Sequence, residues 1–471
     1  MLKYNRQINE YLCRWSPVSQ NIKPIKMKGS AIMKANKILA IIMAALLAAI
    51  TFTSCSGGGT SEGTAGSEGS AGAGQKITIW AWDETFNIKA AEVAKEMYQK
   101  DNPDTEIEIV TMAQDDIVQK LHTSLSSGQT SGLPGIVLIE DYKAQNFLSA
   151  YPDAFADLTD IVDENAFVDY KFAVNKINDK IYGVPFDSGV AGLFYRTDYI
   201  EQAGYSKEDM QNLTWEEYIE IGKAVKEKTG HAMLTLDPSD MGQIRIMMQS
   251  AGSWYVKEDG QTVDIKDNEA LKEGITIYKA MLDAGIVEQV SDWDSFVSAF
   301  QSGKVASIPM GCWIGSSVIK AEDQSGKWAI APIPRLGNNK NSVNYSSIGG
   351  GGWYVINGVG DTNANKDFLS KTFASSKELA NQLAKDINLV STLKAANDTE
   401  NYGAKNDFFG GQQIFKDFSE WSEKVPSVNY GLHTYAIEDI MTEAVQAIVG
   451  GADMQETLDA AQTQAEGAVI S

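Results

Sequence analysis

Carboxylates and tryptophans stand at several points of this sequence where a ligand could be held. Trp82-Asp83-Glu84 and Glu140-Asp141 each follow an apolar run that predicts a strand, and ligands commonly meet a sheet at the carboxyl ends of parallel strands. Trp313 and Trp353 follow glycines, which permit close backbone approach. Taken together, the candidate ligand contacts are Trp82, Asp83, Glu84, Glu140, Asp141, Asp187, Asp240, Trp254, Trp313 and Trp353.

These residue types suit a ligand rich in hydroxyl groups. Carboxylates accept strong hydrogen bonds from hydroxyls, and aromatic faces cover patches of C–H bonds. The chain has ten Trp and 62 acidic against 40 basic side chains. Phosphate or carboxylate ligands favour Arg forks, yet only Arg196, Arg245 and Arg335 follow residue 54. A neutral sugar fits best, and a polyamine also suits an acidic, Trp-rich site. The net charge of −22 argues against nucleic acid.

The sequence offers little support for catalysis, a bound cofactor or a metal site. His122, His231 and His433 are isolated, without an HExxH helix or a cysteine cluster for zinc. The glycines 349–352 lack the Lys-Ser/Thr of a phosphate loop. The acids Asp259, Asp264 and Asp267 could hold Ca²⁺, but the order of an EF-hand is absent. We therefore predict no catalytic residue, no cofactor and no metal site, with these three acids in solvated loops.

Strand and helix patterns alternate after residue 75. Alternating or continuous apolar residues predict strands at 76–80, 106–110 and 136–139, and helical spacing predicts helices at 86–100 and 115–125. This order favours a parallel sheet with right-handed crossovers. Further helices are predicted at 215–228 (capped by Thr214), 268–284, 366–372 and 378–386, with a terminal helix at 435–449. Two α/β lobes account for this pattern.

The N-terminus has the features of an export signal. Residues 1–54 hold eight basic side chains and one acidic one, and 38–50 form an uncharged apolar run of 13 residues. A membrane-spanning helix needs roughly 20 residues, so this run fits the core of a signal peptide. Translation from Met33 gives a conventional signal, with the preceding residues as an upstream extension.

Cys55 ends the signal after Thr53 and Ser54. This segment resembles the lipobox of bacterial lipoproteins, which implies that the Cys55 sulfur carries lipid (palmitate) and becomes the mature N-terminus. More than one acyl chain gives a durable anchor. Residues 56–75 contain eight glycines in twenty and no large apolar side chain, so 55–75 predict a lipidated cysteine followed by a flexible linker. Apart from Cys55 the cysteines are Cys13 and Cys312, so no disulfide is expected after cleavage.

Five segments, in order, resemble the maltose-binding-protein-like family of solute-binding proteins, which serve ATP-binding-cassette (ABC) importers of carbohydrates. The most specific is Lys180–Asp198, KIYGVPFDSGVAGLFYRTD, with a proline, an acid beyond it and an aromatic-Tyr-basic-X-Asp end. The others are Thr214–Glu217, Phe300–Ala306, Met310–Trp313 and Gly350–Trp353. The resemblance covers nearly 400 residues, and in it Trp313 and Trp353 are expected to stack on a sugar.

The resemblance implies a two-lobed α/β fold of the periplasmic-binding-protein type II, with the ligand cleft between lobes joined by a hinge. We expect lobe 1 at 76–185 and about 331–375, and lobe 2 at 186–330 and about 376–471, after the signal at 1–54. The implied protein is not an enzyme. It is a monomer, anchored by lipid to the outer face of the bacterial cell membrane, that delivers a sugar or oligosaccharide to ABC transporter permease subunits. The alternatives are an exported, lipid-anchored carbohydrate-active enzyme and a binding protein for a non-sugar solute such as a polyamine.

Overall fold

A computed structural model describes residues 76–470, which fall within one compact unit. The predicted signal, Cys55 and the linker lie outside the described residues. The strands are β1 (Lys76–Ala81), β2 (Glu106–Thr111), β3 (Ile136–Glu140), β4 (Lys176–Ile177), β5 (Lys180–Ile181), β6 (Gly183–Pro185), β7 (Ala191–Arg196), β8 (Leu234–Leu236), β9 (Val287–Gln289), β10 (Ser307–Gly311), β11 (Trp328–Pro332) and β12 (Gly351–Val355).

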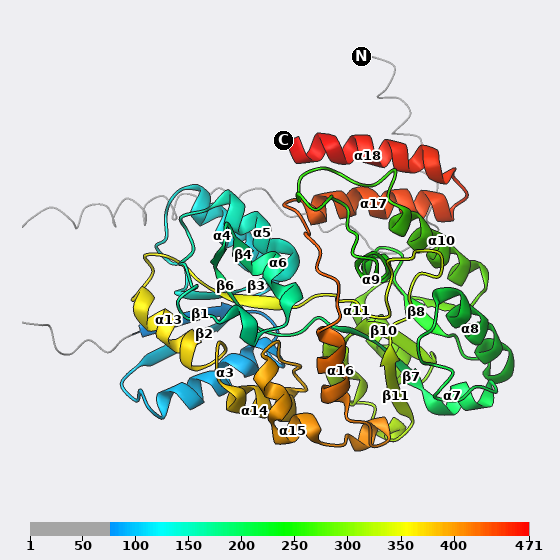
Figure 1. The fold of residues 1–471 in the computed structure, drawn as a ribbon, viewed down its shortest axis with the longest axis horizontal. Coiled ribbons are helices and arrows are strands. Elements are labelled where there is room, and N and C mark those ends of the chain that lie inside the picture. Colours follow the sequence, from blue (N-terminus) through cyan, green and yellow to red (C-terminus); the bar gives the residue numbers. More distant parts are fainter. Residues whose placement is uncertain (1–75, 471) are drawn as a thin grey trace, which may run out of the picture. The chain divides into compact units, whose positions relative to one another are not determined.

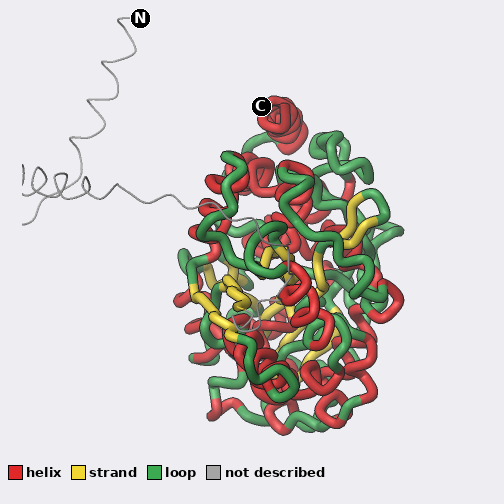
Figure 2. The backbone as a smooth tube through the Cα atoms, turned by 90° about the vertical axis from the view of Figure 1, so that its left-hand side faces the viewer, coloured by secondary structure: helices red, strands yellow, loops and turns green. Residues whose placement is uncertain are grey.

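Helices flank these strands along the whole described chain. The α-helices are α3 (Asn87–Gln99), α4 (Gln114–Ser126), α5 (Asp141–Ala150), α6 (Phe172–Asn175), α7 (Thr197–Gln202), α8 (Trp215–Thr229), α9 (Gly242–Ser250), α10 (Glu269–Asp283), α11 (Trp293–Gln301), α12 (Gly315–Val318), α13 (Thr362–Lys371), α14 (Lys377–Ile387), α15 (Glu400–Gly403), α16 (Ile414–Ser422), α17 (Thr434–Val449) and α18 (Met454–Ile470). Figure 2 shows strands enclosed by helices and loops. None of the helices in 76–470 is long and apolar enough to cross a membrane.

Two separate sheets organise two lobes (Figure 1). The sheet of the first lobe has the order β2-β1-β3-β12-β6, and that of the second lobe has the order β10-β7-β11. In the first, β1 pairs in parallel with β2 and β3, as the alternation of strands and helices predicts. The late strand β12 runs antiparallel between β3 and β6, so the sheet is mixed rather than wholly parallel.

Local sequence signals account for some helix starts. Thr214 caps α8 through a capping box with Glu217, and the Asn268 side chain caps α10. The helix predicted to end the chain, α17, is followed by α18, which packs against it and was missed. The glycines 450 and 451 therefore separate two helices rather than ending the fold.

Three chain segments cross between the lobes and are joined by backbone hydrogen bonds. The first follows β6, the second precedes β12, and the third follows α14. Ser188 N donates to Val390 O at 2.8 Å, and Ile348 N donates to Gly189 O at 2.8 Å. We call these segments, 186–190, 346–350 and 388–392, the crossing segments. They place backbone from both lobes beside the site described next.

Candidate functional site

A cavity of about 400 Å³ lies between the two lobes, a size typical of a small-ligand site. It is walled by the β1–α3 turn, the end of β3, the crossing segments, the start of α11 and the β10–α12 segment. We call it the cleft hollow. Its lining side chains include five of the predicted contacts together with residues that were not predicted: Trp82, Asp83, Thr85, Phe86, Asn87, Gln114, Leu138, Glu140, Asp187, Trp293, Trp313, Ser316, Ser317 and Lys320.

The β1–α3 turn brings Trp82 and Asp83 to the cleft hollow. Asp83 adopts a left-handed conformation with a φ of 60°, which an Asp tolerates better than most residues. Its Oδ1 accepts hydrogen bonds from the N–H of Thr85 and of Phe86, at 2.9 and 3.1 Å. One carboxylate oxygen thus shapes the turn, while Asp83 remains exposed at the hollow.

Glu140 ends β3 and is held by both lobes. Its Oε2 accepts hydrogen bonds from Gln114 at 3.1 Å, Lys143 at 3.3 Å and the hydroxyl of Tyr435 at 2.5 Å. Tyr435 lies on α17 of the second lobe, so this bond joins the lobes. The Glu140 carboxylate is therefore oriented before any ligand binds.

Asp187 lies in the first crossing segment, where the resemblance places an acid beyond a proline. Its Oδ1 accepts a hydrogen bond from Gly351 N at 2.8 Å. Burial raises its pKa, while Lys171 and the Gly351 N–H oppose that rise. This carboxylate lines the cleft hollow at the point where the lobes are joined.

Two indoles of the second lobe face the cleft hollow. Trp313 donates from Nε1 to Ile348 O at 3.0 Å, so the second crossing segment orients its ring. A Cβ at Gly311 would stand 2.2 Å from that Nε1, which explains the glycine two residues earlier. The Trp293 ring lies 5.9 Å from Trp313 between centroids and is 49% exposed. The pair offers aromatic surface to the apolar face of a ligand.

The prediction that Asp141 contacts a ligand is wrong in this structure. Asp141 begins α5 and is 2% exposed, with its Oδ2 2.5 Å from Lys171 Nζ. Burial raises its pKa to about 6, against the opposing effect of Lys171. Lys171 also donates to the carbonyls of Asp187 and Gly351, at 3.3 and 3.0 Å. This buried ion pair supports the crossing segments from beneath the hollow.

The expected stacking role of Trp353 is also wrong, because its ring is fully buried. β12 pairs with strands on both sides, and Trp353 packs against Phe186 and Phe373 at centroid distances of 5.2 and 5.0 Å. The glycines before it allow β12 to fit between β3 and β6. They do not bring the indole to the surface.

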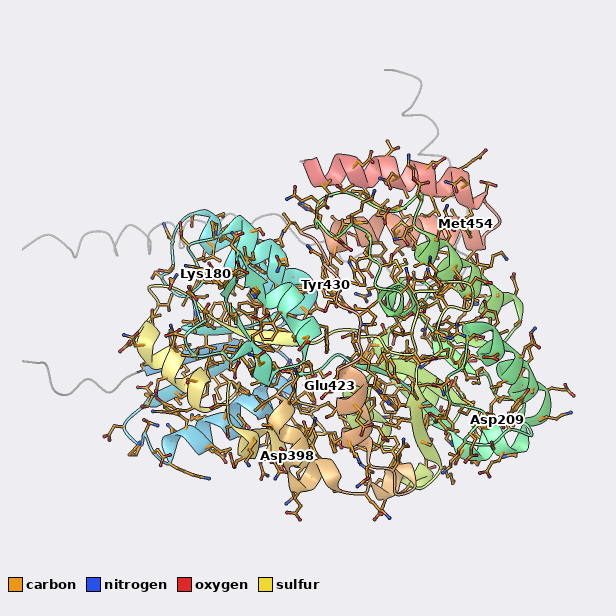
Figure 3. All side chains as sticks on the ribbon, in the orientation of Figure 1. Lys180, Asp209, Asp398, Glu423, Tyr430 and Met454 are labelled. Atoms are coloured by element: carbon orange, nitrogen blue, oxygen red, sulfur yellow. The ribbon has the colours of Figure 1, made fainter. Side chains whose placement is uncertain are left out.

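Trp254 is 2% exposed and belongs to a packed aromatic group between the lobes. Its ring stacks on Tyr142 of α5 at 5.5 Å, and Tyr430 lies 4.6 Å from both rings. We call these three residues the aromatic contact; Figure 3 labels Tyr430 where the lobes meet. Trp254 Nε1 donates to Thr434 Oγ1 at 3.1 Å. The predicted ligand contact at Trp254 is therefore replaced by interlobe packing.

Glu84 and Asp240 do not line the cleft hollow. Glu84 is exposed in the β1–α3 turn beside two residues that do line it. Asp240 lies before α9, where its Oδ1 accepts from Gly242 N at 2.8 Å and from Arg245 at 3.3 Å. Asp240 shapes a turn in the second lobe, and the structure does not bring it to the other candidates.

A larger, more open cavity of about 860 Å³ lies beside Asp259, Asp264 and Asp267. We favour the cleft hollow as the site because this larger cavity is lined mainly by the second lobe and has no exposed aromatic ring. Asp259 accepts hydrogen bonds from Thr262 and Gln261 within its own turn, which lowers its pKa to about 2. Within residues 76–470 no three His, Cys, Asp or Glu side chains form a group that could hold a metal ion.

The cleft hollow can hold a neutral, hydroxyl-rich molecule. Carboxylates of Asp83, Glu140 and Asp187 accept hydrogen bonds, and Gln114 adds an amide. Indoles at 82, 293 and 313 supply apolar faces. Because these groups come from both lobes, a ligand that touches all of them stabilises the closed arrangement.

Comparison with known proteins gives the same assignment. The model for "Bacterial extracellular solute-binding protein" matches residues 94–410. A lactose-binding protein of Rhizobium radiobacter is 44% identical over 394 residues, which cover 84% of this chain and 93% of that protein.

Solved structures share the fold. The sugar-binding protein MalE of Xanthomonas citri aligns with a TM-score of 0.69 at 18% identity, over 84% of this chain and 97% of that one. A galacto-N-biose-/lacto-N-biose I-binding protein of the ABC transporter of Bifidobacterium longum aligns with a TM-score of 0.66 at 21% identity, over 84% and 97%. The two-lobed α/β arrangement is therefore confirmed, and the chain belongs to the family of bacterial extracellular solute-binding proteins.

Proposed function

We propose that this protein is an extracellular receptor that captures a sugar, with lactose as the first candidate, for an ABC transporter. The observation that carries the proposal is the cleft hollow, where carboxylates, an amide and indoles from both lobes converge. The similarity to a lactose-binding protein over most of both chains supports the choice of ligand. Delivery then requires that permease subunits in the membrane recognise the closed form, with the receptor acting as a monomer.

A panel of ligands tests this function. Thermal unfolding is measured with lactose, maltose, an arabino-oligosaccharide and spermidine, because a ligand that binds only the native state raises the melting temperature. We expect lactose to raise it and spermidine to leave it unchanged. A shift with spermidine and none with the sugars would identify a polyamine receptor instead.

The alternative of a carbohydrate-active enzyme is tested by product analysis. The relatives that support the assignment are binding proteins, and the carboxylates of the cleft hollow are all engaged in shaping turns, strand ends or crossing segments. After prolonged incubation we expect lactose to be recovered intact. Release of free galactose and glucose by the purified protein would overturn the receptor assignment.

We also propose lobe boundaries, with two revisions. The first crossing segment supports the boundary near 185. The second boundary moves from about 331 to about 346, because β11 pairs with β7 of the second lobe and Arg335 N donates to Leu213 O at 2.9 Å. α14, however, packs on α3, and Leu379, Leu383 and Ile387 lie in the hydrophobic core of the first lobe. We therefore move the last boundary from about 375 to about 393, with lobe 2 resuming after it.

Lipid anchoring at Cys55 remains a proposal that rests on the sequence alone. An extracellular protein that feeds a membrane transporter is kept near it by such an anchor. Cys55→Ser should release the protein from membranes, measured by partitioning between membrane and soluble fractions. Cys312→Ser is the matched control, since that buried thiol should not affect partitioning. Equal membrane binding of both variants, together with no lipid on the N-terminal peptide by mass spectrometry, would refute the anchor.

A further inference from the structure

The cleft hollow does not end at its lining indoles. A second, shallower cavity of about 560 Å³ adjoins it and shares Trp293, Ser317 and Lys320 with it. The additional wall comes from α11, including Asp294 and Ser298. We call this second cavity the outer hollow. Because three residues line both cavities, a ligand that fills the cleft hollow lies next to the outer hollow.

Trp293 is exceptional among the large apolar side chains of residues 76–470. Only Trp293 and Tyr435 among them are exposed, and the Tyr435 hydroxyl is engaged by Glu140. Phe296, one turn along α11, stacks nearly parallel to Trp293 at 9° and 5.4 Å and thereby orients it. An indole held in place by a neighbour yet half exposed at the junction of two cavities is a ready stacking surface.

The polar groups around the outer hollow are available to a ligand. No partner for the side chains of Asp294, Ser317 or Lys320 is found among the described residues. They offer acceptors, a hydroxyl and a donor beside the indole. Since Asp294 and Lys320 have opposite charges, the outer hollow favours a neutral unit over a phosphate or a uronate.

We propose that the outer hollow is a further sugar subsite, with Trp293 as its platform, so that the protein binds a trisaccharide more tightly than a disaccharide. The inference rests on the proposed sugar-binding function and extends it to the length of the ligand. One additional stacked sugar unit should strengthen binding by about tenfold.

The test uses the full mature protein and three probes. They are lactose, a trisaccharide with one more galactose at its non-reducing end, and a trisaccharide with one more glucose at its reducing end. Binding is measured by titration calorimetry for the wild type and for Trp293→Ala, Asp294→Ala and Trp82→Ala. We expect one trisaccharide to bind about tenfold more tightly than lactose. Trp293→Ala should reduce this ratio to near one, and Asp294→Ala should reduce it in part.

Trp82→Ala is the matched control, because Trp82 lines the cleft hollow but not the outer hollow. It should weaken lactose and the trisaccharide equally and leave the ratio unchanged. A wild type that binds lactose but prefers neither trisaccharide overturns the subsite and leaves the receptor function standing, as does an unchanged ratio in Trp293→Ala. Absence of binding to all three probes overturns both.

Discussion

The two lobes meet at two aromatic regions that differ in solvent exposure and in how tightly their rings pack. In the aromatic contact, Tyr142, Trp254 and Tyr430 are each at most 3% exposed and pack ring against ring. In the cleft hollow, Trp293 and Trp313 lie beside open volume, and Trp293 is half exposed. The first region gains its energy from contacts already made within the protein. The second keeps its apolar surface for a ligand, so aromatic content alone does not mark a binding site.

The two regions also differ in one of their cations. Next to the aromatic contact, the Arg245 guanidinium lies 5.0 Å from the centre of the Tyr142 ring and forms an ion pair with Glu438 at 3.3 Å. In the cleft hollow, Lys320 has no ion pair among residues 76–470. The Arg245 guanidinium therefore belongs to the interface between the lobes, whereas the Lys320 ammonium remains available to a ligand, although Glu140 in the same hollow is paired with Lys143.

Trp254→Ala should have the largest effect and act on stability. Removing a buried indole leaves a cavity, at a cost of about 3–5 kcal/mol in the free energy of unfolding. Urea titration followed by circular dichroism measures it. Sugar affinity of the folded variant should fall far less than stability. A variant with wild-type stability would show that the aromatic contact is not a packed region.

Glu438 should make stability depend on pH. Burial raises its pKa to about 7, while Arg245 opposes the rise. The folded state then holds the proton at a pH where the unfolded chain has lost it. This contribution to stability is complete below about pH 4.5 and is lost as the pH rises through about 7.

Glu438→Gln removes this titration and should flatten the decline. A rise of roughly 2.5 pKa units at about 1.4 kcal/mol per unit makes the decline on the order of 3 kcal/mol. Urea midpoints from pH 4.5 to 8 provide the measurement. Asp439→Asn, which removes an exposed carboxylate next to Glu438 on the same helix, is the control. Parallel curves for wild type and Glu438→Gln would contradict the assignment.

Trp313→Ala should affect binding rather than folding. Loss of a partly exposed stacking ring should weaken lactose binding by about 30-fold, or about 2 kcal/mol. The melting temperature without ligand should change little compared with that of Trp254→Ala. Calorimetry and thermal unfolding on the same samples separate the two effects. Normal affinity with a large loss of stability would move Trp313 from the site to the core.

Tyr435→Phe should have the smallest effect and act on the balance between open and closed forms. The change deletes only the hydrogen bond to Glu140 across the lobes, worth about 1 kcal/mol. Without sugar, small-angle scattering should show a larger radius of gyration for the variant; with saturating lactose the two proteins should coincide. Identical scattering without sugar would mean that this bond does not hold the lobes together.

Neighbouring residues show where sequence reasoning succeeded and where it failed. The end of β3 was predicted, and Glu140 does reach the cleft hollow. Asp141 does not, because Lys171, thirty residues later, pairs with it inside the protein. Trp313 and Trp353 each follow a glycine by one or two residues, so the local sequence does not distinguish them. Trp353 is buried because β12 pairs with both β3 and β6. Such long-range partners leave no mark in the local pattern.

The opposite error occurred at Trp293, which was left out of the predicted site. It was not among the candidate contacts, yet it lines the cleft hollow, while Phe296 and Phe300 on the same helix are buried. Trp293 is the first residue of α11, and the first lobe does not cover its side chain, so a cavity remains there. Helical periodicity predicts the face of the helix on which a residue lies, but it does not predict whether another element covers that face.

The position of β12 has a consequence for how the chain folds. β12 supplies the pairing that joins β6 to the rest of its sheet, yet it lies more than 200 residues after β3, its other partner. Contacts so distant in sequence form slowly, because a long loop must close first. With the N-terminal signal that the sequence predicts, the chain would leave the cell from its N-terminus, and its first lobe could not be completed until residues beyond 355 had followed. Late arrival of this one strand would then keep the first lobe incomplete, and the chain unfolded, during most of its passage.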